Sequence, residues 1–135
     1  MAGYPAPWAL CGGWAVDWWL GRQTRDHGDI DITVFSSDQP ALFAHLRDWN
    51  LVPHDAVAPA GSDPWDGHVL VLPAHIHARP PGAENRARVV SWVTPPYVNA
   101  RDGLDLELVI NEGRDDAWVL SEDPALSLPF ARAIA

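Results

Sequence analysis

The sequence predicts an α+β fold in which helices pack on a mixed sheet of about five or more strands. Two segments, residues 29–35 and 104–110, alternate apolar and polar side chains with the period of a strand. Between them, apolar residues recur at helical spacing over residues 42–49. The chain has 135 residues and is 47% hydrophobic, which is enough for a core. We therefore expect residues 1–135 to form a single domain.

A glycine pair, Gly12 and Gly13, joins an apolar segment at residues 8–11 to a helix predicted over residues 14–20. The apolar segment is typical of a buried strand, and Gly21 is suited to end the helix in a left-handed conformation. Glycines let a phosphate approach the backbone, and the first N–H groups of a helix carry partial positive charge. The order of these elements indicates a phosphate site, although a simple tight turn uses the same glycines.

Two aspartates, Asp29 and Asp31, lie on one face of the strand predicted at residues 29–35. Ile30 and Ile32 lie on the other face, toward the core. Neighbouring like charges repel, and a divalent cation with hard oxygen ligands offsets that repulsion. The sequence therefore predicts a metal ion on the aspartate face.

A second acidic face is predicted in the strand at residues 104–110, where Asp105 and Glu107 point to the same side. These carboxylates also fit the outward positions of an antiparallel strand. Two acidic strand faces can instead meet and form one cation site. Residues 111–113 are expected to turn the chain after this strand.

Further strands are expected at short apolar segments bounded by turn residues, namely residues 51–52, 68–72, 74–78, 89–93 and 117–120. Pro53 is expected to end the first of these strands, and the last is expected to be an edge strand. His75 and His77 share one face of their strand. This pair suits either a zinc site or the polar face of a half-exposed strand.

The net charge is −9, and all nine basic residues are arginines. Sequence-independent nucleic-acid binding needs positive charge, so this chain better suits a metal ion or a cationic small molecule. The single cysteine, Cys11, excludes an intramolecular disulfide. The sequence shows no signal peptide and no apolar run of membrane-spanning length. We therefore expect a cytoplasmic protein without nucleic-acid or membrane partners.

Three segments in the first third carry distinctive motifs: Gly-Gly-Trp-Ala-Val-Asp at residues 12–17, Leu-Gly-Arg-Gln-Thr-Arg at 20–25, and His-Gly-Asp-Ile-Asp-Ile at 27–32. Together they resemble the opening of the antibiotic nucleotidyltransferases. The resemblance is strongest to the aminoglycoside 2″-nucleotidyltransferase and lincosamide nucleotidyltransferase branch of the polymerase-β-like superfamily. It resumes at residues 106–112, 116–119 and 123–124. The combination of motifs is far more specific than any one of them.

The resemblance implies a minimal nucleotidyltransferase fold, a small mixed sheet with helices on one side. It implies that Gly12 and Gly13 hold the triphosphate of a nucleoside triphosphate, the co-substrate. Arg25 and His27 precede the aspartate strand and are expected beside any bound anion, although a solvated loop is the alternative.

The resemblance also implies that Asp29 and Asp31 hold two Mg²⁺ ions. A third carboxylate on a neighbouring strand completes the site and deprotonates the acceptor hydroxyl. Alignment places that carboxylate at Glu107, with Asp105 as the alternative. The implied reaction is in-line attack on the α-phosphate with release of pyrophosphate, and the acidic composition favours a small cationic acceptor, aminoglycoside- or lincosamide-like.

The chain departs from this family at both ends and in its lack of lysine. Relatives begin with an additional helix and continue with helical sequence after the position of Pro129. We expect arginine to replace lysine contacts, and a homodimer is one way to supply a missing wall of the acceptor site. Two other functions remain open: a minimal nucleotidyltransferase-fold antitoxin, and a relative that has lost nucleotidyl transfer and uses its pocket for another reaction or for binding.

Overall fold

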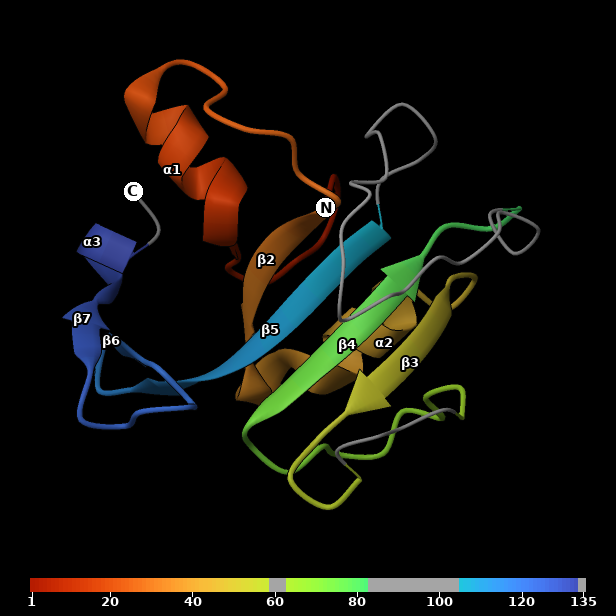
Figure 1. The fold of residues 1–135 in the computed structure, drawn as a ribbon. Coiled ribbons are helices and arrows are strands. Elements are labelled where there is room, and N and C mark those ends of the chain that lie inside the picture. Colours follow the sequence, from red (N-terminus) through yellow and green to blue (C-terminus); the bar gives the residue numbers. More distant parts are fainter. Residues whose placement is uncertain (59–62, 83–104, 134–135) are drawn as a thin grey trace.

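The computed structural model describes residues 1–58, 63–82 and 105–133, which form an α+β fold around one mixed sheet (Figure 1). This confirms the predicted fold class. The strands are β1 (Ala9–Leu10), β2 (Asp29–Phe35), β3 (Asn50–His54), β4 (Ala74–Arg79), β5 (Asp105–Arg114), β6 (Ala117–Val119) and β7 (Ser127–Pro129). The helices are α1 (Gly12–Leu20), α2 (Gln39–His45) and α3 (Phe130–Ala133), and a 3₁₀ turn (Ser36–Asp38) precedes α2. None of the helices in these ranges is both long and apolar enough to cross a membrane.

The centre of the sheet is the parallel pair of β2 and β5. The strand order is β1-β2-β5-β4-β3, and the other neighbours in this order pair antiparallel. β5 continues past these strands and pairs with β6, which in turn pairs with β7. The register between β2 and β5 positions the candidate site, because it sets Asp31 opposite Glu107.

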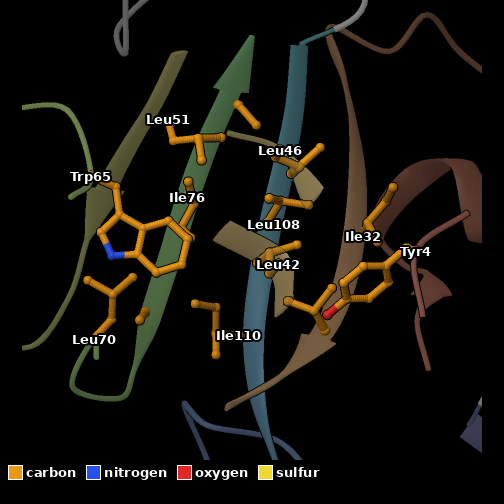
Figure 2. Close-up of a cluster of buried hydrophobic side chains, with 13 residues drawn as sticks. Tyr4, Ile32, Leu42, Leu46, Leu51, Trp65, Leu70, Ile76, Leu108 and Ile110 are labelled. Atoms are coloured by element: carbon orange, nitrogen blue, oxygen red, sulfur yellow. The ribbon is translucent and has the colours of Figure 1, made fainter. Parts of the chain in front are cut away.

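The core lies between α2 and one face of the sheet (Figure 2). Ile32 of β2, Leu108 of β5 and Ile76 of β4 contribute the sheet side of this core. Leu42 of α2 and Leu46, the C-cap of that helix, pack against them, and Leu42, Ile76 and Leu108 are fully buried. Because side chains alternate along a strand, the polar residues between these positions point to the opposite face.

Residues 68–72 do not form a strand, contrary to the sequence prediction. Their backbone groups bind side chains instead: Leu70 N–H donates to Oε1 of buried Gln39 at 2.8 Å, and Val71 N–H donates to Oδ2 of Asp55 at 3.0 Å. Leu70 is buried, whereas Val71 is half exposed. Leu70 and Leu72 pack on the core while Val69 and Val71 are exposed, so this irregular segment buries alternate residues as a strand does.

Several predicted element boundaries are also wrong. Pro53 lies inside β3, where the strand pairs with β4 alone and a missing N–H is tolerated. Residues 111–113 continue β5, and the chain turns instead at Asp115 and Asp116, which both have positive φ. β6 is not an edge strand, because β7 pairs with it. The strand predicted at residues 89–93 lies outside the described residues.

Candidate metal and nucleotide site

Three carboxylates converge on the sheet face opposite the core. Asp29 and Asp31 come from β2, and Glu107 comes from β5, where the parallel register places it directly opposite Asp31. One oxygen atom from each carboxylate lies within 4.8 Å of the others. All three residues are partly buried. The structure thus brings together the three residues that the sequence singled out as metal ligands.

Asp105, the alternative third carboxylate, interacts with a different partner. The register places it opposite Asp29, but its Oδ2 accepts a hydrogen bond from Nε of Arg79 on β4 at 3.1 Å. The carboxylate cluster contains Glu107 and does not include Asp105. The geometry therefore favours Glu107 as the third carboxylate.

The electrostatic environment differs within the cluster. Burial raises the pKa of Asp29, and the nearby charge of Glu107 raises it further. Burial and the nearby charge of Asp29 likewise raise the pKa of Asp31. A hydrogen bond from His75 instead lowers the pKa of Glu107. The two aspartates are therefore the groups that a bound cation would stabilise most in their ionised form.

The donor set of this cluster fits Mg²⁺. Mg²⁺ binds hard oxygen ligands and usually takes one or two carboxylates together with substrate phosphates. Asp29, Asp31 and Glu107 supply carboxylate oxygens, and the cluster has no thiol or imidazole ligand. Its partial exposure leaves room for ligands from a substrate.

The glycine turn lies against this cluster, and α1 begins there. Gly12 has a φ of +61°, and a Cβ atom at this position would collide with the carboxylate of Asp31. The N–H of Cys11 donates to the carbonyl oxygen of Asp31 at 2.9 Å. The predicted order of strand, glycine pair and helix is confirmed. It places a helix N-terminus, which favours anions, beside carboxylates that favour cations.

The connector between α1 and β2 is held by a buried pair, Asp17 and His27. Nε2 of His27 lies 2.5 Å from Oδ2 of Asp17, and the hydroxyl of Thr24 donates to Oδ1 of Asp17 at 2.5 Å. These hydrogen bonds, with that of Thr24 the largest cause, lower the pKa of Asp17 to about 2. A Cβ atom on Gly13 would collide with the His27 ring and the Arg25 guanidinium. Both predicted anion-site residues of the connector therefore lie beside the glycine turn, and His27 is buried there.

His75 of β4 links Glu107 to Glu122. Its Nδ1 lies 3.0 Å from Oε1 of Glu107, and its Nε2 lies 3.0 Å from Oε1 of Glu122. The hydrogen bond with Glu107 raises the pKa of His75. His77 shares this strand face, as predicted, and its ring contacts the ring of His54 at a centroid distance of 4.8 Å. The ligand cluster found in the described part of the chain contains no histidine, so it gives the zinc alternative no support.

The fold and the site together define a class of protein: an α+β domain with a carboxylate cluster beside a glycine turn at the start of a helix. Residues 1–59 of the chain match the model of the aminoglycoside-2″-adenylyltransferase family. The matched part contains the glycine turn, the connector, Asp29 and Asp31, whereas Glu107 lies beyond it. No curated protein and no solved structure is significantly similar to the chain.

Sequence reasoning singled out His27 and His75 but missed the partner of each, Asp17 for His27 and Glu122 for His75. Asp17 and His27 had a local signal, because a charged residue in a helix rich in tryptophan needs a partner when it is buried. Glu122 and His75 had none: 47 residues separate them, and only the fold brings them together.

Proposed function

We propose that the protein is a Mg²⁺-dependent nucleotidyltransferase that moves a nucleoside monophosphate from a nucleoside triphosphate to a hydroxyl group of a small cationic acceptor, such as an aminoglycoside. The observation that carries this proposal is the convergence of carboxylate oxygens from Asp29, Asp31 and Glu107 within 4.8 Å. The family match over residues 1–59 supports the same reaction class and favours aminoglycosides as acceptors. The net charge of −9 is consistent with a cationic acceptor.

In this proposal the triphosphate binds at the glycine turn. Because Gly12 and Gly13 have no Cβ, the side chains of Asp31, His27 and Arg25 lie directly against the turn. The first N–H groups of α1 favour the negative charge of a phosphate there. Arg25 lies beside Gly13 and supplies the cationic side chain. Asp17 and His27 hold the connector, so that the turn and Arg25 keep their relative positions.

Asp29, Asp31 and Glu107 would hold the metal ions. Two Mg²⁺ ions in such a site stabilise the charge on the attacking and leaving oxygens of a phosphoryl displacement. The lowered pKa of Glu107 keeps its carboxylate ionised, as both metal binding and proton acceptance require, and at the same time makes it a weaker base. The acceptor hydroxyl oxygen bonds to the α-phosphorus, its proton passes to Glu107, the bond between the α-phosphorus and the β-phosphate oxygen breaks, and pyrophosphate leaves.

Isothermal titration calorimetry with ATP and GTP, with and without Mg²⁺, tests the binding half of this proposal. We expect nucleotide binding that depends on Mg²⁺ and that is lost in the double variant Asp29→Asn, Asp31→Asn. Absence of nucleotide binding by the folded wild-type protein would contradict the proposal and favour a pocket that serves another reaction. Co-purification of a toxin partner in place of nucleotide binding would favour the antitoxin function.

A further inference from the structure

We infer that His75, held in turn by Glu122, is a positioning residue that fixes the orientation of the Glu107 carboxylate toward Asp29 and Asp31. This inference rests on the proposed role of Glu107 in the metal site. It explains why hydrogen bonds join Glu107 of β5, His75 of β4 and Glu122 of the segment after β6.

His75 lies on the same face of the sheet as Glu107, on the neighbouring strand. In the antiparallel register His75 pairs with Val109 and His77 pairs with Glu107, so His75 is a diagonal neighbour of Glu107 on the same face. Its Nδ1 lies 3.0 Å from Oε1 of Glu107. A hydrogen bond across two adjacent strands restricts the Glu107 side chain, which otherwise has several rotatable bonds.

The His75 ring is held at both of its nitrogen atoms. Nε2, on the side of the ring away from Glu107, lies 3.0 Å from Oε1 of Glu122. Rotation of the His75 side chain about its Cα–Cβ bond would break both hydrogen bonds at once. A ring held in this way presents Nδ1 to Glu107 in one orientation.

The segment that carries Glu122 is anchored to the centre of the sheet. The N–H of Ser121 donates to Oδ1 of Asn111 at 2.9 Å, and Nδ2 of Asn111 donates to the hydroxyl of Thr33 at 2.6 Å. Asn111 and Thr33 are buried and are diagonal neighbours on one face of β5 and β2. The position of Glu122, and through it that of His75, is thus tied to the strands that carry the carboxylates.

The expected effect follows from the behaviour of outer-shell partners in metal sites. Carboxylates that bind a metal ion are held by hydrogen bonds, and loss of such a partner typically weakens metal affinity or activity about 10- to 100-fold. Without His75, the Glu107 carboxylate would sample several orientations. Metal binding would then have to restrict the carboxylate to one orientation, and the loss of conformational entropy would lower the metal affinity.

The experiment measures Mn²⁺ binding to the nucleotide-free protein by electron paramagnetic resonance, with Mn²⁺ as the probe for a Mg²⁺ site. We expect His75→Phe to weaken Mn²⁺ binding about 10- to 100-fold. His75→Asn places an amide donor near the position of Nδ1, so its affinity should lie closer to that of the wild type. Glu122→Ala should give a weaker loss, because it releases only the far end of the ring. His68→Asn is the matched control, because His68 pairs with Asp66 in an exposed loop.

Circular dichroism shows whether each variant is folded, and if His75→Phe does not fold, Glu122→Ala and His75→Asn carry the test. Wild-type affinity in His75→Phe, or in Glu122→Ala when His75→Phe is unfolded, would overturn the inference. An equal loss in His75→Asn and His75→Phe would also overturn it, because ring packing and not the hydrogen bond would then matter. Absence of Mn²⁺ binding in the wild type would instead overturn the proposed metal site, and the inference with it.

Discussion

Gly12 is the residue at which the backbone turn and the carboxylate cluster constrain each other most. Gly21→Ala should lose about 1–2 kcal/mol of stability because its φ is positive, and Gly12→Ala should lose more, because its φ is also positive and its Cβ would collide with Asp31. Only Gly12→Ala should also weaken Mg²⁺-dependent nucleotide binding, because its Cβ would displace the Asp31 carboxylate, whereas nothing lies within 4 Å of a Cβ at Gly21. Urea unfolding and calorimetry measure the two effects. Equal nucleotide affinity in the two variants would contradict this role of Gly12.

Asp29 and Asp31 should destabilise the metal-free protein at neutral pH. Their pKa values are raised in the folded state, so the folded protein binds these protons more tightly than the unfolded chain. The corresponding stability is present below the usual aspartate pKa of about 3.9 and is lost as the pH rises through the folded-state values. Asp31→Asn should therefore raise the melting temperature in EDTA at neutral pH, and this gain should shrink on acidification. The same substitution at exposed Asp48 should show no such gain.

The site illustrates at the level of residues what a sequence can predict. Alternation along a strand placed Asp29 and Asp31 on one face, and the same rule proposed Asp105 and Glu107 for the other strand. It did not distinguish Asp105 from Glu107, because that choice depends on a hydrogen bond from Arg79 on a third strand. The local sequence carries no information about such a contact.

Asp17 connects two elements, because it holds the connector that follows α1 close to the start of β2. Hydrogen bonds from Thr24 and His27 lower its pKa to about 2. A lowered pKa contributes stability that is present above the usual value of about 3.9 and is lost as the pH falls through the folded-state value. Asp17→Asn should therefore be less stable than the wild type at pH 7, and the difference should close between roughly pH 4 and pH 2.

Thermal unfolding as a function of pH measures this difference. Asp26→Asn is the matched control, because Asp26 lies in the same connector and is exposed. If the stability difference between Asp17→Asn and the wild type stays constant down to pH 2, the hydrogen bonds to the ionised Asp17 carboxylate do not have the role assigned to them.

Predictions of helices and strands are confirmed where neighbouring residues in the sequence determine the element. Residues 29–35 form a strand as predicted, and Gly21 ends α1 with a φ of 65°. The predictions at residues 68–72 and 111–113 are wrong for different reasons. The side chain of Gln39 binds the backbone of the first segment, whereas the second segment continues β5 because residues 112–114 pair with β6. Both partners lie outside the segment concerned, and periodicity within a segment does not reveal them.

In the whole molecule, the sheet face that packs on the core should determine stability, and the opposite face should carry the residues of the reaction. Leu108 is fully buried and points away from the site, between Glu107 and Val109. Leu108→Ala should lower the free energy of unfolding by about 2–5 kcal/mol. Val69→Ala, at a position 69% exposed, should change it by less than about 0.5 kcal/mol. Urea unfolding checks both values, and a similar small change in the two variants would contradict the assignment of the core.

In the proposed function, the carboxylate cluster supports transfer of a nucleoside monophosphate to an acceptor hydroxyl. The most direct measurement incubates the protein with ATP, Mg²⁺ and a panel of aminoglycosides, and follows pyrophosphate release together with the mass of each acceptor. We expect pyrophosphate and an acceptor heavier by one nucleoside monophosphate, and a fall of about a thousandfold or more in the double variant Asp29→Asn, Asp31→Asn, since a bound metal ion supplies several kcal/mol. Unchanged turnover in that double variant would contradict this proposal. It would also be contradicted if the wild-type protein binds Mg²⁺ and ATP but leaves the mass of every acceptor unchanged.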